Sequence, residues 1–433
     1  MSPAPAPRSA HLEVVVSGSG PAPAPGPART RRRLPRRPVI VGAGALAAVV
    51  AAVAVWGWAA PDAPAHRAAY ADGLPHTRVD VLSGACGRGW DHPRPGRQAF
   101  DVRNTSGRAV EVYLRNARTG AVLGEVEGLG PGTTRTVRAD VGGGSYAFAC
   151  YPDDAVPVTG PTVKVPDGAG QKGGPAAVPV SLHDLIPPTL SYQHWVTDRM
   201  DDLVTATGAL RSAIRAGDLG RARAAWLPAH LVYERMGAAY GTFGDADQAI
   251  NGTTAGLPGG AHDKDFTGFH RIEYGLWHGE SASALRPLAD QLTDDVSTLR
   301  TDWKRARMDP LDVGLRAHEI LENTLQFELT GRTDYGSGSS LATARANLDG
   351  TRAVLTRLRP LLTTRYPGLT ELETELASTQ RLLDQQKRPD HDGGWTPLKG
   401  LDRSRREKVN ADVGELLERL ADIAALCDVR RTP

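Results

Sequence analysis

Residues 267–277 read TGFHRIEYGLW, and the rest of the chain can be interpreted from this stretch. His270 and Glu273 are three residues apart, so in a helix they share one face. Phe266, Phe269 and Leu276 fall on or beside that face. Burying an unpaired carboxylate costs several kcal/mol, so Glu273 needs a partner charge, hydrogen bonds or a metal. The stretch therefore predicts either a structural His–Glu hydrogen bond or part of a metal site.

Two further helical segments carry the same pair of residue types one turn apart, and a loop between two helices carries two acids. These residues are His230 with Glu234, His318 with Glu322, and Asp245 with Asp247. Helical bundles build metal sites from carboxylates and histidines on facing helices. We therefore predict that these residues join His270 and Glu273 around a metal, with a hydrogen-bonded polar layer as the alternative. Iron, as Fe2+ or Fe3+, suits such a mixed ligand set, and copper or zinc would also accept the imidazoles.

Residues 189–430 have a helical period throughout and predict an all-α bundle. The expected helices lie near 190–215, 219–240, 266–278, 283–307, 311–330, 338–366, 369–387 and 403–427. Asp218 and Ser339 are expected N-caps. The Pro- and Gly-rich residues 167–188 predict a linker before the bundle.

Residues 74–166 change to a period of two, with turn signals between short runs, and predict an all-β sandwich. The chain has three cysteines. Outside the cytoplasm, Cys86 and Cys150 could close a disulfide. The alternative is an accessory metal site with Glu111, Glu125 or Glu127. Cys427 lies in an apolar helical pattern, which favours a buried free thiol.

The N-terminal region predicts a membrane segment. Residues 1–38 are rich in Pro, Ala and Arg, which indicates a disordered basic tail in the cytoplasm. Residues 39–60 carry no charge and are long enough to cross a bilayer. The preceding arginines place everything after residue 60 outside the cytoplasm. We expect a single-pass transmembrane anchor, or a secreted protein if the segment is a cleavable signal. The net charge of +2 argues against nucleic-acid binding.

Several stretches resemble the EfeO-type iron-uptake family. In the helical region they are AHLVYER at 229–235, FGD at 243–245, TGFHRIE at 267–273, RAHEILE at 316–322 and LATA at 341–344. In the β region they are Cys86, Phe100, Asn104, GPG at 130–132 and GSYAFAC at 144–150. The resemblance implies a cupredoxin-like β domain followed by an imelysin-like helical domain. It also implies metal ligands at His270 and Glu273, together with Glu234 and either Asp245 or Asp247.

The same resemblance implies an extracytoplasmic protein that presents iron to a membrane permease, with a haem peroxidase as a further partner. Two other functions are alternatives: a metal-dependent peptidase and a polysaccharide-binding protein of the imelysin-like family. A zinc peptidase usually needs an H-E-x-x-H helix, whereas this chain has H-x-x-E with Tyr274 in the next position. We therefore expect no enzyme activity. The β region lacks methionine and has only His76 and His92, so we expect no blue-copper centre.

Overall fold

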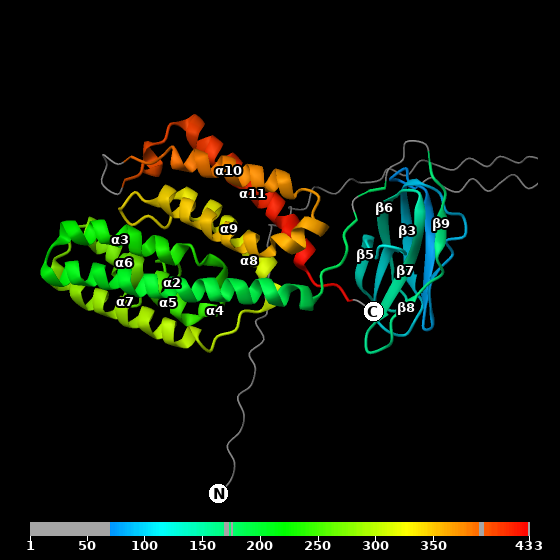
Figure 1. Ribbon diagram of the computed structural model, residues 1–433, viewed down its shortest axis with the longest axis horizontal. Coiled ribbons are helices and arrows are strands. Elements are labelled where there is room, and N and C mark those ends of the chain that lie inside the picture. The colour runs from blue at the N-terminus through cyan, green and yellow to red at the C-terminus, as the bar shows by residue number, and fades with distance from the viewer. Residues whose placement is uncertain (1–69, 169–172, 175, 389–393, 432–433) are drawn as a thin grey trace, which may run out of the picture. The chain divides into compact units, whose positions relative to one another are not determined.

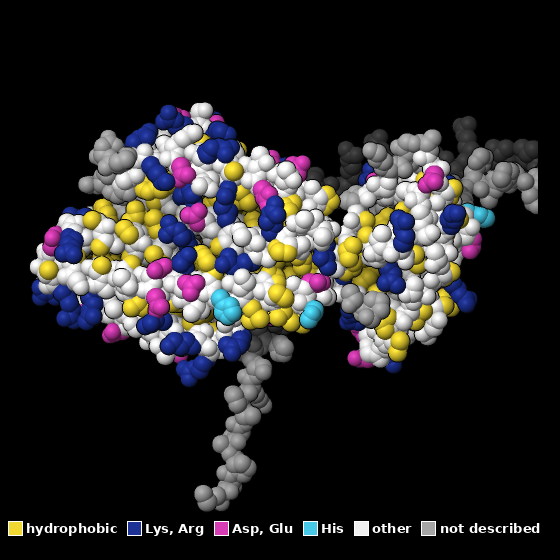
Figure 2. Space-filling view, viewed as in Figure 1, with side chains coloured by type: hydrophobic (Ala, Val, Ile, Leu, Met, Phe, Trp, Pro, Cys, Tyr) yellow, Lys and Arg dark blue, Asp and Glu magenta, His cyan; other side chains and the backbone are white. Residues whose placement is uncertain are grey.

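The computed structural model describes residues 70–168, 173–174, 176–388 and 394–431 (Figure 1). The first part of this chain forms strands, and the part from Leu182 onward forms helices. Figure 2 shows Lys and Arg side chains intermingled with Asp and Glu over the visible face. That face therefore presents charges of both signs to solvent.

The strands form two sheets. Their bounds are β1 His76–Leu82, β2 Ala85–Arg88, β3 Gly96–Asn104, β4 Val110–Asn116, β5 Val122–Leu129, β6 Thr134–Val141, β7 Gly144–Pro152, β8 Val158–Thr159 and β9 Val163–Val165. One sheet has the order β2-β1-β3-β6, and the other has the order β5-β4-β7-β8, with β9 also paired to β7. β1 runs parallel to β3, while the other pairs are antiparallel. The all-β sandwich expected over 74–166 is therefore present.

The core of the sandwich contains a disulfide. Cys86 on β2 is bonded to Cys150 on β7, with their Cα atoms 5.9 Å apart. Trp90, Phe100 and Phe148 pack edge to face around it in one apolar cluster. The expected disulfide is therefore confirmed, and neither cysteine is free to supply a thiolate to an accessory metal site.

The predicted fold class needs two corrections. The first concerns the label cupredoxin-like, which is not supported. The two cysteines are bonded to each other, and the ring nitrogens of His76 lie 2.9 Å from Asp101 and 3.1 Å from Asp72. The structure supports a two-sheet sandwich and no more specific description.

The second correction concerns the membrane. Among the described residues, no helix is both long enough and apolar enough to cross a bilayer. The predicted fold class with a transmembrane helix is therefore corrected to a two-sheet β region followed by a helical domain. The predicted tail at 1–38 and span at 39–60 lie outside the described residues.

The helical part consists of long helices joined by short ones (Figure 1). Their bounds are α2 Leu182–Ala216, α3 Leu219–Glu234, α4 Tyr240–Phe243, α5 Asp245–Asn251, α6 Gly268–Trp277, α7 Ala282–Trp303, α8 Val313–Gln326, α9 Ser340–Arg365, α10 Leu369–Asp384 and α11 Arg403–Cys427. Short 3-10 turns include η1 Gly237–Ala239 and η4 Glu328–Thr330.

The first long helix begins eight residues earlier than expected. The Ser181 hydroxyl caps it by accepting a hydrogen bond from the backbone N–H of Asp184, and the Asp184 carboxylate accepts one from the backbone N–H of Ser181. This capping box satisfies free N–H groups at the start of the helix. Pro187 and Pro188 are then tolerated inside α2, although each removes one backbone donor.

The helix predicted over 219–240 is shorter than expected and ends at Glu234. The turn η1 and the short helices α4 and α5 follow it. Gly244 separates α4 from α5 with a φ of 59°, a conformation that favours glycine. Asp245 and Asp247 therefore lie in the first turn of a helix and not in a loop.

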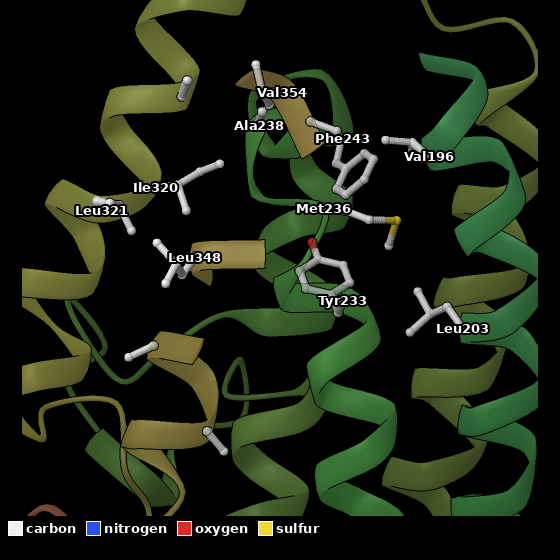
Figure 3. Packing of buried hydrophobic residues seen from close by; sticks show 14 of the residues in the cluster. Val196, Leu203, Tyr233, Met236, Ala238, Phe243, Ile320, Leu321, Leu348 and Val354 are labelled. Carbon is white, nitrogen blue, oxygen red and sulfur yellow. The ribbon is translucent and has the colours of Figure 1, made fainter. Parts of the chain in front are cut away.

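One continuous apolar core joins the helices. Figure 3 shows Tyr233 and Met236 between Val196 and Leu203 of α2 on one side and Ile320 of α8 on the other. All five side chains are at most 5% exposed. The C-terminal end of α3 is thus fixed inside the bundle, one turn from His230.

Candidate metal centre

Four of the predicted ligands come together inside the bundle. α3 supplies His230 and Glu234, and α6 supplies His270 and Glu273. Their exposed fractions are 1%, 5%, 3% and 1%. Charged groups are seldom buried to this extent without partners, so their hydrogen bonds decide what the cluster can do.

Glu234 is held by three neighbours. Its Oε1 lies 3.0 Å from Nε2 of His230 and accepts a hydrogen bond from Nδ2 of Asn251 at 2.8 Å. Nε2 of His230 is also 3.0 Å from Oδ1 of Asn251. Asn347 donates to Oε2 at 2.9 Å and accepts from Thr324 when its amide nitrogen faces Glu234. α3, α5 and α9 are therefore joined at this carboxylate.

Glu273 is held mainly by the loop before α9. Its Oε1 accepts hydrogen bonds from the backbone N–H of Tyr335 at 3.0 Å and of Ser337 at 3.1 Å, and from the Ser337 hydroxyl at 2.5 Å. Its Oε2 lies 3.3 Å from Nδ1 of His270. One carboxylate oxygen is thus occupied by the protein, while the other faces the imidazole.

Aromatic packing sets the positions of the two imidazoles. The ring of His230 stacks on Trp226, with centroids 4.9 Å apart, and meets the ring of His270 edge to face at 5.1 Å. Trp226 donates from Nε1 to the carbonyl of Phe269 at 2.9 Å, which ties α3 to α6. Nδ1 of His230 is buried and has no hydrogen-bond partner among the described residues. An imidazole nitrogen in that state is suited to a ligand that the protein itself does not provide.

Gly268 allows α6 to approach α5 this closely. Its φ is 75°, and a Cβ atom built there would lie 2.1 Å from the carbonyl oxygen of Ile250. Any side chain would have to move α6, which begins at this residue. The glycine of the G-x-H-x-x-E stretch therefore sets the distance between the segments that carry Asn251 and His270.

A polar cavity of about 300 Å³ opens beside the cluster. Glu234, Asp247, His270, Glu328 and Asn347 are among the residues that line it. Asp247 accepts a hydrogen bond of 2.5 Å from the Tyr233 hydroxyl. Glu328 is 9% exposed and accepts a bond from the Thr333 hydroxyl at 2.7 Å. Asp247 and Glu328 thus add two carboxylates to the wall of the cavity that Glu234 and His270 also line.

Burial shifts the pKa values of these groups strongly. It raises the pKa of Glu273 to about 8, and it raises that of Glu328 to about 8 with help from the charge on Glu234. Burial lowers the pKa of His270 to about 3, so this imidazole is neutral near pH 7. For Glu234, burial works against ionisation, but His230 and Asn251 lower its pKa overall. The cluster therefore holds a neutral imidazole and acids that bind protons when no cation is present.

Three predicted site residues lie elsewhere. Asp245 is exposed. His318 and Glu322 lie on a half-exposed face of α8, 3.8 Å apart, and neither lines the cavity. The structure brings together His230, Glu234, His270, Glu273 and, across the cavity, Asp247. Sequence reasoning missed Asn251, Glu328, Asn347 and Ser337.

Within the described chain, no group of three or more His, Cys, Asp or Glu side chains is already arranged to hold a metal ion. The nearest pairs are bonded to each other: His230 with Glu234, and His270 with Glu273. An ion could enter only by replacing these hydrogen bonds and the protons on the raised-pKa acids. The donor set of carboxylates and imidazoles fits a hard or borderline cation such as iron.

Comparison with known proteins identifies the family of the helical region. The Peptidase_M75 (imelysin) family matches residues 189–424, which is more than half of the chain. The chain is 26% identical over 354 residues to the "Iron uptake system component EfeO" of Escherichia coli O1:K1 / APEC, covering 82% of this chain and 92% of that protein. The protein of the same name from Yersinia pseudotuberculosis is 26% identical over 329 residues, covering 76% and 84%. The predicted resemblance to EfeO-type proteins is confirmed.

A solved structure, described as a putative iron-regulated protein A precursor from Parabacteroides distasonis, covers 57% of this chain and 96% of its own. It has 12% sequence identity and a TM-score of 0.44. The match to the family model covers the helices that carry His230, Glu234, His270 and Glu273. This chain belongs to the imelysin family.

Proposed function

We propose that this protein is the extracytoplasmic iron-binding component of an iron uptake system and that it presents iron to a membrane permease. Relatives that align over most of the chain are named as iron uptake components. The observation that carries the proposal is the buried cluster of two carboxylates and two imidazoles between α3 and α6.

The chemistry of the cluster supports cargo binding. His270 is neutral and can act as a ligand. Nδ1 of His230 lacks a partner, but burial, which lowers the pKa of His230, is outweighed by Glu234, which raises it, so a metal would have to displace a proton there. Oε2 of Glu273 faces His270, while Oε1 is occupied by loop donors. We assign His270, Glu273, Glu234 and Asp247 as the groups that hold the iron, with Asn251 and Asn347 orienting Glu234.

The disulfide supports a location outside the cytoplasm. Disulfides persist in oxidising compartments and are rare in the cytosol. Cys86 and Cys150 are buried in the sandwich core at 1% and 3% exposure, so their bond is part of the folded structure. The permease and a haem peroxidase of the same uptake system are the partners that we propose.

We propose binding and not catalysis. A hydrolytic zinc site keeps one metal position open for water, next to a carboxylate that acts as a base. Here Glu273 is held by three hydrogen bonds from the loop at 335–337. With Oε1 held in this way and Oε2 facing His270, the carboxylate is suited to holding an ion in a fixed position.

Calorimetric titration of the purified protein with Fe2+ under anaerobic conditions tests the proposal, with Fe3+ supplied as its nitrilotriacetate complex in parallel. Metal content of the purified protein gives an independent measure. We expect one tightly bound iron per chain, lost in His270→Gln. His318→Gln is the matched control because it removes a histidine from a half-exposed position. Binding that is equal in both variants, or absent from the wild type, would rule the assigned site out.

A further inference from the structure

A second pocket lies along another face of α3 and has a different chemistry. Its volume is about 670 Å³, within the range of small-molecule sites. Among the residues that line it are Arg223, Leu227, Leu231, Arg235, Trp277 and Trp395. It shares none of these residues with the cavity beside the metal cluster.

The walls of this pocket suit a flat ring. α3 contributes an apolar strip of Ala224, Leu227 and Leu231, and the half-buried indoles of Trp277 and Trp395 also line it. Indoles pack against other aromatic rings in offset or edge-to-face arrangements, an attraction that aliphatic groups do not provide. The pocket therefore favours an aromatic ligand over an aliphatic one.

Arg223 adds a fixed positive charge. Its Nε and Nη2 atoms both donate to the carbonyl of Leu276, at 3.0 and 2.8 Å, which holds the guanidinium beside Trp277. No Asp or Glu of the described chain forms an ion pair with Arg223. Arg235 differs, because its Nε lies 3.5 Å from a carboxylate oxygen of Asp349. Arg223 is thus the group in this pocket whose charge a ligand can complement.

The pocket also adjoins the metal cluster through stacked rings. Trp277 meets Trp226 edge to face with centroids 5.6 Å apart, and Trp226 stacks on His230 at 4.9 Å. Trp277 is thus linked to His230 through one intervening buried indole, that of Trp226.

We propose that this pocket binds a planar aromatic anion, such as an aromatic carboxylate or sulfonate. The aromatic body packs between Trp277 and Trp395, and the anionic group pairs with the Arg223 guanidinium. This site is separate from iron binding and does not depend on it.

The test uses 8-anilinonaphthalene-1-sulfonate as the anionic probe and N-phenyl-1-naphthylamine as its neutral counterpart. Each is titrated into the folded full-length protein, and energy transfer from tryptophan gives the dissociation constant. We expect saturable binding of one sulfonate probe per chain, at least tenfold tighter than the neutral probe. Arg223→Gln should weaken sulfonate binding about tenfold and leave the neutral probe unchanged, and Trp277→Leu should weaken both.

Trp195→Leu is the matched control. Trp195 is also half-buried, and Arg199 and Arg357 lie over its ring at 5.1 and 5.5 Å, but it does not line this pocket. Binding in this variant should equal that of the wild type. Arg223 is exposed, so its substitution removes two hydrogen bonds to Leu276 but no core side chain, and the test does not depend on the folding of Trp277→Leu. The proposal is overturned by absent saturable binding, by equal affinity for the two probes, or by equal losses in Trp195→Leu and Trp277→Leu.

Discussion

The backbone N–H of Tyr335 donates a 3.0 Å hydrogen bond to Oε1 of Glu273, 62 residues earlier in the chain. Ser337 adds a backbone and a hydroxyl donor to the same oxygen. A carboxylate that the sequence places on α6 is therefore oriented by the loop before α9. The cluster exists only when helices from distant parts of the bundle have packed.

Glu273→Gln should remove iron binding while the protein stays folded. The amide oxygen can still accept from Tyr335 and Ser337, but the ligand loses its charge. We expect iron affinity to fall at least about a hundredfold. Removing a residue that only supports a metal ligand costs up to about that factor, and Glu273 is itself assigned as a ligand. Calorimetry measures the affinity, and thermal unfolding of the iron-free protein measures the fold. Glu322→Gln is the control, and unchanged affinity in Glu273→Gln would move the site elsewhere.

The stability of the iron-free protein should fall as the pH rises from about 6.5 to 8. The pKa values of Glu273 and Glu328 are raised to about 8 by burial, above that of an unfolded glutamate. The folded state then binds more protons than the unfolded state, and this advantage disappears as the pH rises through the folded pKa. Each group should contribute a loss of about 1–2 kcal/mol in this range.

Urea unfolding at several pH values measures this effect, and Glu273→Gln with Glu328→Gln should flatten the curve. Iron binding should show the opposite trend, becoming tighter with rising pH because the metal displaces those protons. An iron-free protein whose stability is constant or rises from pH 6.5 to 8 would contradict the buried, protonated state of these acids.

Tyr233→Phe should destabilise the bundle by about 1–3 kcal/mol, since the Asp247 carboxyl loses its 2.5 Å donor. Burial raises the pKa of Asp247 to about 6, and the Tyr233 bond holds it down. The variant should therefore raise this pKa further, which carboxyl NMR titration would detect. Tyr240→Phe is the control, because Tyr240 makes only a 3.3 Å bond to the Tyr233 carbonyl. Equal effects of the two substitutions would refute the role given to the Tyr233–Asp247 bond.

Replacing Cys86 and Cys150 together by alanine should destabilise the sandwich selectively. The disulfide closes a separation of 64 residues, and such links typically contribute about 2–4 kcal/mol. Hydrogen exchange should increase in β2 and β7 but not in α3 or α6. Cys427→Ser is the control, since Cys427 is a buried free thiol next to Gly314 of the bundle. Unchanged exchange in the strands would show that the apolar core alone holds the sandwich together.

The spacing of apolar residues predicted those helices and caps whose structure depends on residues close by in the sequence. α6 was recognised from the apolar face around His270 and Glu273, and its ends differ by one or two residues from the prediction. Asp218 is the N-cap of α3, as expected, and accepts from Arg221 N. These features depend on neighbours within one or two turns, which the sequence displays directly.

The same kind of pattern failed for His318 and Glu322. Their stripe includes Leu311 and Leu315, which are 48% and 44% exposed, whereas Ala317, Ile320 and Leu321 face the core. Apolar residues occur on both faces of α8, so spacing alone could not show which face is buried. Glu328 was missed for a related reason, because its burial in a short turn depends on tertiary contacts that have no period.

Gly268 has a consequence for how this sequence can change over time. A side chain there meets the Ile250 carbonyl, and backbone atoms cannot yield as a flexible side chain can. Random mutagenesis of codon 268 under selection for growth on scarce iron should therefore return glycine almost alone. Codon 279 is a useful contrast, since Gly279 has a similar φ of 79° but open space where a Cβ would lie. Asparagine should be recovered at codon 279, because it tolerates a positive φ and has room for its side chain. Gly268 would then be required by a steric clash, and Gly279 only by its backbone conformation.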